Sequence, residues 1–461
     1  MESLPTKDFP KSPSLKKLLG PSFIILGLGL GSGEIILWPY LASNFGLGII
    51  WGAIIGLTFQ FFINMEIERY ALVRGESVFV GLKRKLNWLP FWFILSTFIP
   101  WIWPGIIAAS ATLWGHIFGI TDINLLSIVL LIAIGIILTV GPVLYKTVEK
   151  LQMILISIGV PAIFLLSIFI AKSNDWTALS KGVFGIGNGY FLLPVGISIS
   201  SFLAALAYAG AGGNLNLAQA FYVKEKGYGM GRYSGRITSL ISGKAEKIEV
   251  TGSKFEITKQ NVLQFNQWWR NINIEHFLVF WLTGSITILL LGLLAYTTTF
   301  GMKLSEGIGF VIVESQQISQ IIFPAAGIFF LIVAGSTLFA TQLTVFDATS
   351  RILTENIILQ METKLDSKKI PFVYYFVLWL QIIAGIFIIG LGFSQPLQLL
   401  IIAAVLNAFA MFVHSGLTLW LNTTSLEKEI GPSIWRKIAM ISAFLFYGGF
   451  SLYVIMDKIL Q

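Results

Sequence analysis

A single carboxylate, Glu34, interrupts a long apolar segment near the start of the chain, directly after Gly31, Ser32 and Gly33. A charged side chain in the middle of a membrane segment is costly, so by default it marks a functional site. Glycines at every second position from Gly27 to Gly33 predict that the helix unwinds here. Glu34 would then lie in the first turn of the outer half-helix, where the helix dipole favours its charge. It can ligate a hard cation, pair with an organic cation or carry a coupling proton; the alternative is a structural carboxylate paired to a neighbouring helix.

A second glycine cluster, Gly210, Gly212 and Gly213, precedes Asn214 and Asn216 in a later apolar segment. Backbone groups freed by a break at bilayer depth are tolerated only where they line a cavity enclosed by protein. Paired glycine breaks in two halves are typical of the substrate sites of inverted-repeat transporters. Close helix packing through glycines four residues apart is the alternative. The predicted binding set, with Glu34 as the metal ligand, is Gly31, Ser32, Gly33, Glu34, Gly210, Ala211, Asn214, Asn216 and Asn407.

Charged pairs at helical spacing occur at the predicted cytoplasmic ends of two other apolar segments. Glu66 precedes Arg69 by three residues, and Asp347 precedes Arg351 by four, so each pair shares one helix face. Such pairs can form a gate or a proton path, although a structural ion pair at the membrane interface is the interpretation we favour. The residues of this predicted gate or proton path are Glu66, Glu68, Arg69, Gln342, Asp347 and Arg351.

The composition requires that lipid solvates most of the surface. The 461 residues are 55% hydrophobic and only 12% charged, with a mean hydropathy of +0.80, whereas soluble proteins carry about 25% charged residues. A spanning helix needs about 20 apolar residues, and eleven segments satisfy this. They lie at 20–43, 46–72, 89–119, 124–142, 151–171, 191–221, 273–299, 319–350, 371–392, 396–421 and 433–457.

The distribution of Lys and Arg predicts the orientation. All but Lys172, Lys181, Lys303 and Lys458 of the 31 basic residues fall on one side of an eleven-span chain, and the basic side is cytoplasmic. We expect an integral protein of the plasma membrane with its N-terminus inside and its C-terminus outside. The net charge of +8 lies in short loops, so it does not indicate nucleic-acid binding.

The spans predict two five-helix repeats, at 20–171 and 191–421, preceded by a cytoplasmic tail (1–19) and followed by an eleventh helix at 433–457. The cytoplasmic segment 222–272 is the one sizeable loop. Alternation around a Thr-Gly-Ser turn predicts a β-hairpin at 247–258. Mixed aromatic and polar residues at 262–277 predict an amphipathic helix that lies at the membrane face.

The two glycine motifs resemble those of the Nramp (natural-resistance-associated macrophage protein) metal transporters. Gly20-Pro21 stands some ten residues before Gly31-Ser-Gly-Glu34, where the family carries Gly-Pro before Asp-Pro-Gly-Asn. The run from Gly212 to Leu217 is similar to the family's Met-Pro-His-Asn-Leu-Tyr-Leu stretch. The resemblance implies a five-plus-five inverted-repeat, LeuT-like fold with broken first and sixth helices, and cation transport coupled to protons. It also implies that the tenth helix, with Asn407, borders the site.

This chain departs from the family at the ligands themselves. The family's metal-binding Asp and Asn fall on Gly31 and Glu34, its Met ligand on Ala211 and its sixth-helix His on Gly213. A thioether selects softer metals, whereas one carboxylate, asparagines and carbonyls form an all-oxygen set that suits a hard ion such as magnesium, as proposed for Nramp-related magnesium carriers.

The leading hypothesis is an all-α secondary transporter, not an enzyme, that moves a divalent cation such as magnesium or manganese by alternating access. We expect a coupled proton, no resident cofactor, the lipid bilayer and a small cation as the partners, and a monomer. Two alternatives stay open: a symporter of an organic cation or zwitterionic metabolite with the same fold, and a membrane receptor or scaffold that transports nothing and signals through segment 222–272.

Overall fold

The computed structural model describes residues 4–15, 18, 20–140, 144–235, 249–302, 307–361, 370–393 and 395–460. These residues form an all-helical bundle whose β contacts are limited to two isolated bridges. The helices of the first half are α1 (Pro21–Gly29), η2 (Leu30–Leu37), α2 (Trp38–Phe45), η3 (Leu47–Ile49), α3 (Trp51–Arg74), α4 (Val78–Lys85), α5 (Leu89–Trp101), α6 (Gly105–Phe118), α7 (Ile123–Val140), α8 (Leu144–Ile170) and α9 (Ser173–Gly182).

The second half repeats the order of long apolar helices. Its elements are α10 (Ile199–Ala207), η4 (Gly213–Ala218), α11 (Gln219–Lys226), η5 (Gly229–Tyr233), α12 (Lys259–His276), η6 (Phe277–Leu282), α13 (Thr283–Thr299), α14 (Gly309–Ile321), α15 (Pro324–Gln360), α16 (Ile370–Gly390), α17 (Pro396–Ser425) and α18 (Ile434–Leu460). Here η2 and η6 are π-helical, and η3, η4 and η5 are 3₁₀-helical.

Ten helical stretches among the described residues are long and apolar enough to cross a membrane. The remaining predicted span is the sixth, which the structure divides into the short helices α10 and α11 around a break. Large apolar side chains such as Phe169, Phe387 and Trp435 are well exposed, while many polar side chains are buried between the helices. Lipid is the solvent that such a surface requires, so the chain is an integral membrane protein.

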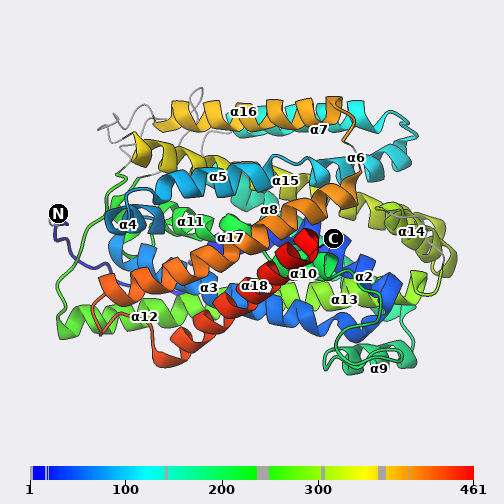
Figure 1. The fold of residues 1–461 in the computed structure, drawn as a ribbon, viewed down its shortest axis with the longest axis horizontal. Coiled ribbons are helices and arrows are strands. Elements are labelled where there is room, and N and C mark those ends of the chain that lie inside the picture. Colours follow the sequence, from blue (N-terminus) through cyan, green and yellow to red (C-terminus); the bar gives the residue numbers. More distant parts are fainter. Residues whose placement is uncertain are drawn as a thin grey trace.

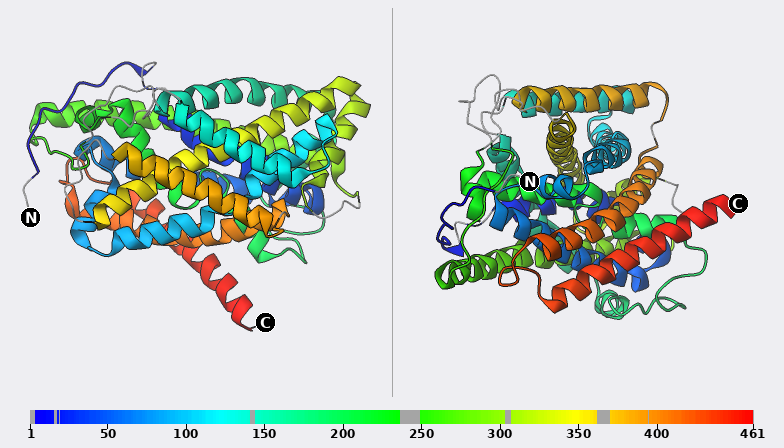
Figure 2. Two further views of the ribbon diagram at one scale, coloured as in Figure 1. Left: turned by 90° about the horizontal axis from the view of Figure 1, so that it is seen from above. Right: turned by 60° about the vertical axis from the view of Figure 1, so that its left-hand side comes forward.

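The bundle is arranged around the first helix. Every residue of α1 and η2 except Phe23 is buried. The helices α7 and α16 pack side by side along one edge, and α12, η6 and α13 form one rod along the opposite edge (Figure 1). The last helix, α18, packs on α17 and α3 and then leans away from the bundle (Figure 2).

The segment after the sixth span differs from the prediction in two places. The expected hairpin at 247–258 is wrong for its described part, 249–258, because Lys254 pairs with Thr6 of the N-terminal tail and residues 249–258 form no strand; residues 247 and 248 lie outside the described part. The expected helix at 262–277 forms as α12, but it is not a separate element, since α12 continues through η6 into α13 as one helical stretch, Lys259–Thr299. Its apolar face packs on the tail, where the Trp268 indole donates to the carbonyl oxygen of Pro10 (2.8 Å).

Candidate functional site

The two glycine clusters lie against each other, backbone to backbone. A Cβ on Gly29 would lie 2.6 Å from the carbonyl group of Gly210, and one on Gly33 would lie 1.5 Å from the carbonyl oxygen of Tyr208. Only glycine permits this approach. Close helix packing, which the sequence offered as the alternative for these residues, therefore accounts for Gly29 and Gly33.

The first break is a widened helix and not an unwound one, which corrects the prediction. Residues Leu30–Leu37 form the π-helix η2, and the N–H group of Trp38 donates to the carbonyl of Gly33. Thr341 of α15 inserts beside this segment: its hydroxyl accepts from the N–H of Gly31 (3.1 Å) and donates to the carbonyl of Gly27 (2.8 Å). Because α2 starts only at Trp38, Glu34 lies inside the π-helix and no helix N-terminus stabilises its charge. A π-helical turn inside an α-helix is frequent at functional sites.

The second break is unwound as predicted, and a glutamine from another helix completes its hydrogen bonds. The chain between Ala207 and Gly213 is not helical, and Gly212 and Gly213 have φ angles of +71° and +55°. The Gln60 side chain of α3 donates to the carbonyl of Ala207 (3.0 Å) and accepts from the N–H of Gly212 (3.1 Å). Sequence analysis missed Gln60, although a buried amide within an apolar helix always needs a partner.

Glu34 is fully buried and has no hydrogen-bond partner. Its side chain is 0% exposed, and neither carboxyl oxygen receives a donor from the described residues. A Cβ on Gly284 of α13 would lie 3.6 Å from Oε1 and 3.2 Å from Leu26 and Leu57, so the carboxyl group lies in an apolar setting next to α13. Thr283 and Ser285 flank Gly284 in the sequence: the Thr283 hydroxyl donates to the carbonyl of Leu278, and the Ser285 hydroxyl is buried without a partner among the described residues. The alternative interpretation, a structural carboxylate paired to a neighbouring helix, is therefore not supported among the described residues.

The three predicted asparagines point to different helices. Asn214 donates to Ser96 and Thr97 of α5 (2.8 and 2.9 Å), and Asn216 donates to Gln60 and Asn64 of α3 (3.1 and 2.7 Å). Asn407 of α17 donates to the Tyr208 hydroxyl (3.0 Å). In each case the amide oxygen remains buried without a donor, as does Oε1 of Gln342. The bonded amide nitrogens hold these side chains in place, and the oxygens are the free atoms.

Tyr208 and His414 complete the surroundings of the second break. The Tyr208 ring stacks on Trp101 of α5 with centroids 5.4 Å apart, and His414 Nε2 lies 2.9 Å from the carbonyl oxygen of Gly213. Gly31, Ser32, Gly210 and Ala211 are all buried at the same crossing. Glu34 lines none of four cavities that the described residues form.

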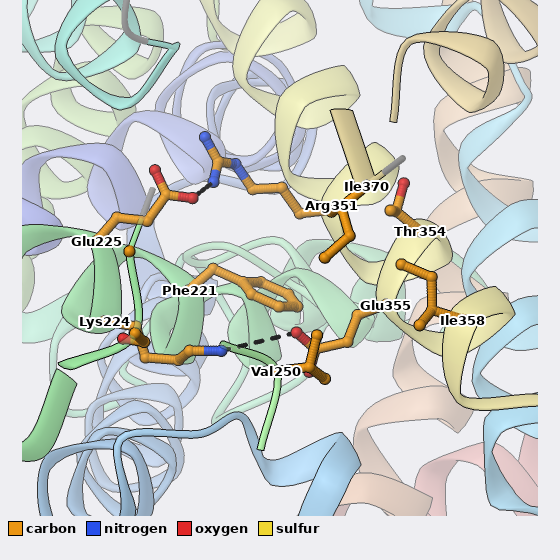
Figure 3. A pocket seen from close by; sticks show the side chains of 11 residues that line it. Phe221, Lys224, Glu225, Val250, Arg351, Thr354, Glu355, Ile358 and Ile370 are labelled. Carbon is orange, nitrogen blue, oxygen red and sulfur yellow. Dashed lines mark hydrogen bonds and ion pairs between the residues drawn. The ribbon is translucent and has the colours of Figure 1, made fainter. Parts of the chain in front are cut away.

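An ion-pair network at the predicted cytoplasmic end joins the second half of the broken helix to α15. Arg351 pairs with Asp347 (2.9 Å), as predicted, and also with Glu225 of α11. The Lys224 ammonium lies 3.7 Å from the Glu355 carboxylate. The two cross-helix pairs lie side by side and line a cavity of about 40 Å³ (Figure 3). Glu225, Lys224 and Glu355 were not predicted, because nothing local in the sequence links positions so far apart.

The second predicted pair also forms. Glu66 and Arg69 are 2.9 Å apart, and Arg436 of α18 lies 3.4 Å from the same carboxylate. The Arg69 guanidinium lies over the Trp269 ring, 3.8 Å from its centroid. Glu68 points elsewhere, since it accepts from the Gln219 amide (3.1 Å). Gln342 precedes Asp347 on α15. Its side-chain oxygen has no hydrogen-bond partner among the described residues, so it joins neither pair.

Comparison with known proteins supports the fold only. No protein-family model matches the sequence, and no curated protein matches it. Two solved structures of the manganese transporter from Eremococcus coleocola are similar: a variant form (TM-score 0.71) and a complex with an aromatic bis-isothiourea substituted compound (TM-score 0.70). Each is 14% identical in sequence, and each match covers 99% of this chain and 90% of that one. The likeness confirms the predicted five-plus-five, LeuT-like architecture with interrupted first and sixth helices.

Proposed function

We propose that this protein is a secondary transporter that moves a cation by alternating access, with Glu34 as the charged ligand. The proposed substrate is a hard divalent metal ion such as magnesium or manganese. One observation carries the proposal: a completely buried carboxylate that has no partner among the described residues lies where two interrupted helices cross, in a fold shared with a manganese transporter.

The charge of Glu34 supports a positively charged substrate. An isolated carboxylate in an apolar setting is strongly destabilising unless it is protonated or meets a cation. A Cβ on Gly284 would contact Leu26, Leu57 and Oε1 of Glu34 alike, so apolar groups lie close to this carboxylate, which receives no donor from the described residues. A bound cation relieves this penalty, and its departure restores it, so binding and release are linked to the state of this one group.

The other unpaired atoms support a hard ion. The buried side-chain oxygens that receive no donor from the described residues include those of Asn214, Asn216, Asn407 and Gln342, in addition to both oxygens of Glu34. Carboxylate and amide oxygens are the ligands of Mg²⁺, Ca²⁺ and Mn²⁺. The amide nitrogens of the three asparagines are bonded to other side chains, so the proposed loaded state requires the two interrupted helices to shift until some of these oxygens approach Glu34. A small ion also suits a carboxyl group that none of the four cavities reaches.

The ion-pair network fits the role of an inner gate. Arg351–Glu225 and Lys224–Glu355 tie α11 to α15 at the predicted cytoplasmic end. Alternating access in inverted repeats moves one helix group against another around a central site. Opening on this side would separate α11 from α15 and hydrate both pairs. Hydration of the separated charges offsets part of the free energy that is lost when a buried ion pair breaks. Such a network can therefore open and close.

The test is ion uptake by the full chain reconstituted in liposomes. We expect accumulation of Mg²⁺ or Mn²⁺, and we expect Glu34→Gln, which keeps the shape and removes the charge, to abolish it. Glu314→Gln is the matched control, since Glu314 is likewise buried and one of its carboxyl oxygens has no partner. Undiminished uptake by Glu34→Gln would refute the assigned ligand. Uptake of an organic cation without any metal would identify the other class of substrate.

A further inference from the structure

A cluster of three buried polar side chains lies apart from Glu34, at the inner end of the first helix. Ser22, in the first turn of α1, hydrogen-bonds through its hydroxyl to the Glu275 carboxylate and lies 2.7 Å from Nδ1 of His276. Glu275 and His276 are the last two residues of α12. The exposed fractions of Ser22, Glu275 and His276 are 0%, 3% and 0%. Nε2 of His276 and Oε1 of Glu275 have no partner among the described residues.

The hydroxyl between the two groups fixes how their protons are arranged. Ser22 has one hydrogen to donate, so it can serve both neighbours only by donating to one and accepting from the other. A histidine protonated on Nδ1 donates to Ser22, which donates to an ionised Glu275. The reverse chain, from a protonated Glu275 through Ser22 to an unprotonated Nδ1, satisfies the same contacts. The hydrogen-bond chain can therefore run in either direction, which allows a proton to be relayed between His276 and Glu275.

The rings and charges around the cluster keep it in place. The His276 ring is stacked between Phe61 and Phe280, with centroids 5.5 and 4.8 Å away. The ionisable groups that act on Glu275 and His276 from neighbouring helices include Glu68 of α3, Lys226 of α11, Arg436 of α18 and Tyr145 of α8. Tyr228 also interacts with Glu275, and Glu149 of α8 acts on Tyr228 in turn. Burial, followed by the charge of Glu275, raises the pKa of the Tyr228 phenol, so this tyrosine stays protonated beside the carboxylate.

Glu275 also holds the start of α1. The hydroxyl of Ser22 hydrogen-bonds to it, at the helix end where the dipole favours a negative charge. Gly20 itself is enclosed, because a Cβ there would lie within 3 Å of Glu149, Tyr145 and Lys226. An ionised Glu275 thus fastens α1 to α12, and a neutral one holds it less strongly.

We propose that Ser22, Glu275 and His276 form the site of the coupling proton, and that its arrival frees the inner end of α1. The proposal rests on the proposed transport function and assigns its proton to this cluster. A proton from water binds Nε2 of His276; the Nδ1 proton passes to the Ser22 oxygen, and the Ser22 proton passes to Glu275. His276 ends neutral with its proton on Nε2, Glu275 ends as the neutral acid, and the charge of the cluster changes from −1 to 0. Return of the proton to water reverses each transfer.

The test follows the position of α1 without any ion flux. The chain has no cysteine, so Ile24→Cys places one thiol on the buried inner part of α1. Its labelling by a membrane-impermeant maleimide is divided by that of Leu263→Cys, an exposed site on α12, which cancels the pH dependence of the thiol reaction. We expect this ratio to rise several-fold as the pH falls from roughly 8 to 5, the range in which histidine and shifted carboxylates titrate.

Variants decide whether the cluster is responsible. With Glu275→Gln, which mimics the neutral acid, the ratio should be high at every pH, and Glu314→Gln should keep the pH dependence. A ratio that ignores pH in the parent, or that still follows pH with Glu275→Gln, overturns the proposal. In liposomes, Glu275→Gln and His276→Gln should lose the proton flux that a trapped pH dye reports, whereas Glu314→Gln should keep it. A parent protein that takes up no metal would instead refute the transport function. The labelling result does not depend on ion flux, so it would still show whether the cluster controls the position of α1.

Discussion

Gly33 lies so close to Tyr208 that a Cβ on Gly33 would come within 1.5 Å of the Tyr208 carbonyl oxygen. This contact joins the interruptions of the two repeats through their backbones. It places the π-helical segment that carries Glu34 directly against the unwound segment that precedes Asn214. The two halves lie this close at the proposed site because Gly33 carries only a hydrogen atom where another residue would carry a side chain.

Gly33→Ala should destabilise the protein by about 1–3 kcal/mol, the usual range for an extra methyl group in a packed core, and should abolish ion uptake. The added carbon must push the two interruptions apart, because the atom it meets is backbone. Thermal unfolding in detergent measures the effect. Gly390→Ala is the control, since nothing lies within 4 Å of a Cβ at that helical glycine, and equal melting temperatures for the two variants would contradict this account.

Gln60→Met should lower the stability by roughly 1–3 kcal/mol for each polar group left unsatisfied. The methionine fills the space but can neither donate to the Ala207 carbonyl nor accept from the Gly212 N–H group. Gln60→Glu should have an intermediate effect, because it keeps the acceptor and loses the donor. Urea or thermal unfolding gives the order, and a Gln60→Met variant as stable as the parent would show that the break needs no such support.

Glu225→Gln should favour opening at the predicted cytoplasmic end. The change removes the Arg351–Glu225 tie between α11 and α15 and leaves the Lys224–Glu355 pair and the hydrogen bond from Tyr222 to Asp347 in place. Faster thiol labelling of a cysteine at Thr354, which lines the cavity between these helices, would report the opening. Glu427→Gln is the control, because its pairing with Arg74 is partly exposed and exposed pairs contribute little. Identical labelling of the two variants would argue against a gate.

Metal ions should stabilise the parent protein and leave Glu34→Gln unaffected. A ligand that binds only the folded state adds about 2.7 kcal/mol when its free concentration is about 100 times Kd. A titration of the melting temperature with Mg²⁺, Mn²⁺ and Ca²⁺ therefore ranks the ions without any flux measurement. Equal stabilisation of Glu34→Gln would place the ion elsewhere in the chain.

The first and sixth interruptions could be located from the sequence because glycine clusters and a lone carboxylate stand out against an apolar background. The form of each interruption could not. Both clusters are rich in glycine, yet the first becomes a π-helix and the second unwinds. Thr341 fits into the side of the first, and Gln60 replaces the missing helix bonds of the second. Each partner lies on a helix that is distant in sequence.

Hydropathy and basic residues by themselves determined the spans, the two halves and the place of Glu34, because a bilayer acts on each segment through its own composition. The tertiary structure decided which atoms meet where Gly33 lies against the Tyr208 carbonyl. Within the described part of the chain, it left Glu34 without a donor, turned Asn214 and Asn216 toward α5 and α3, and linked Arg351 to Glu225. Such relationships depend on how helices far apart in the chain are packed, and local sequence carries no record of that packing.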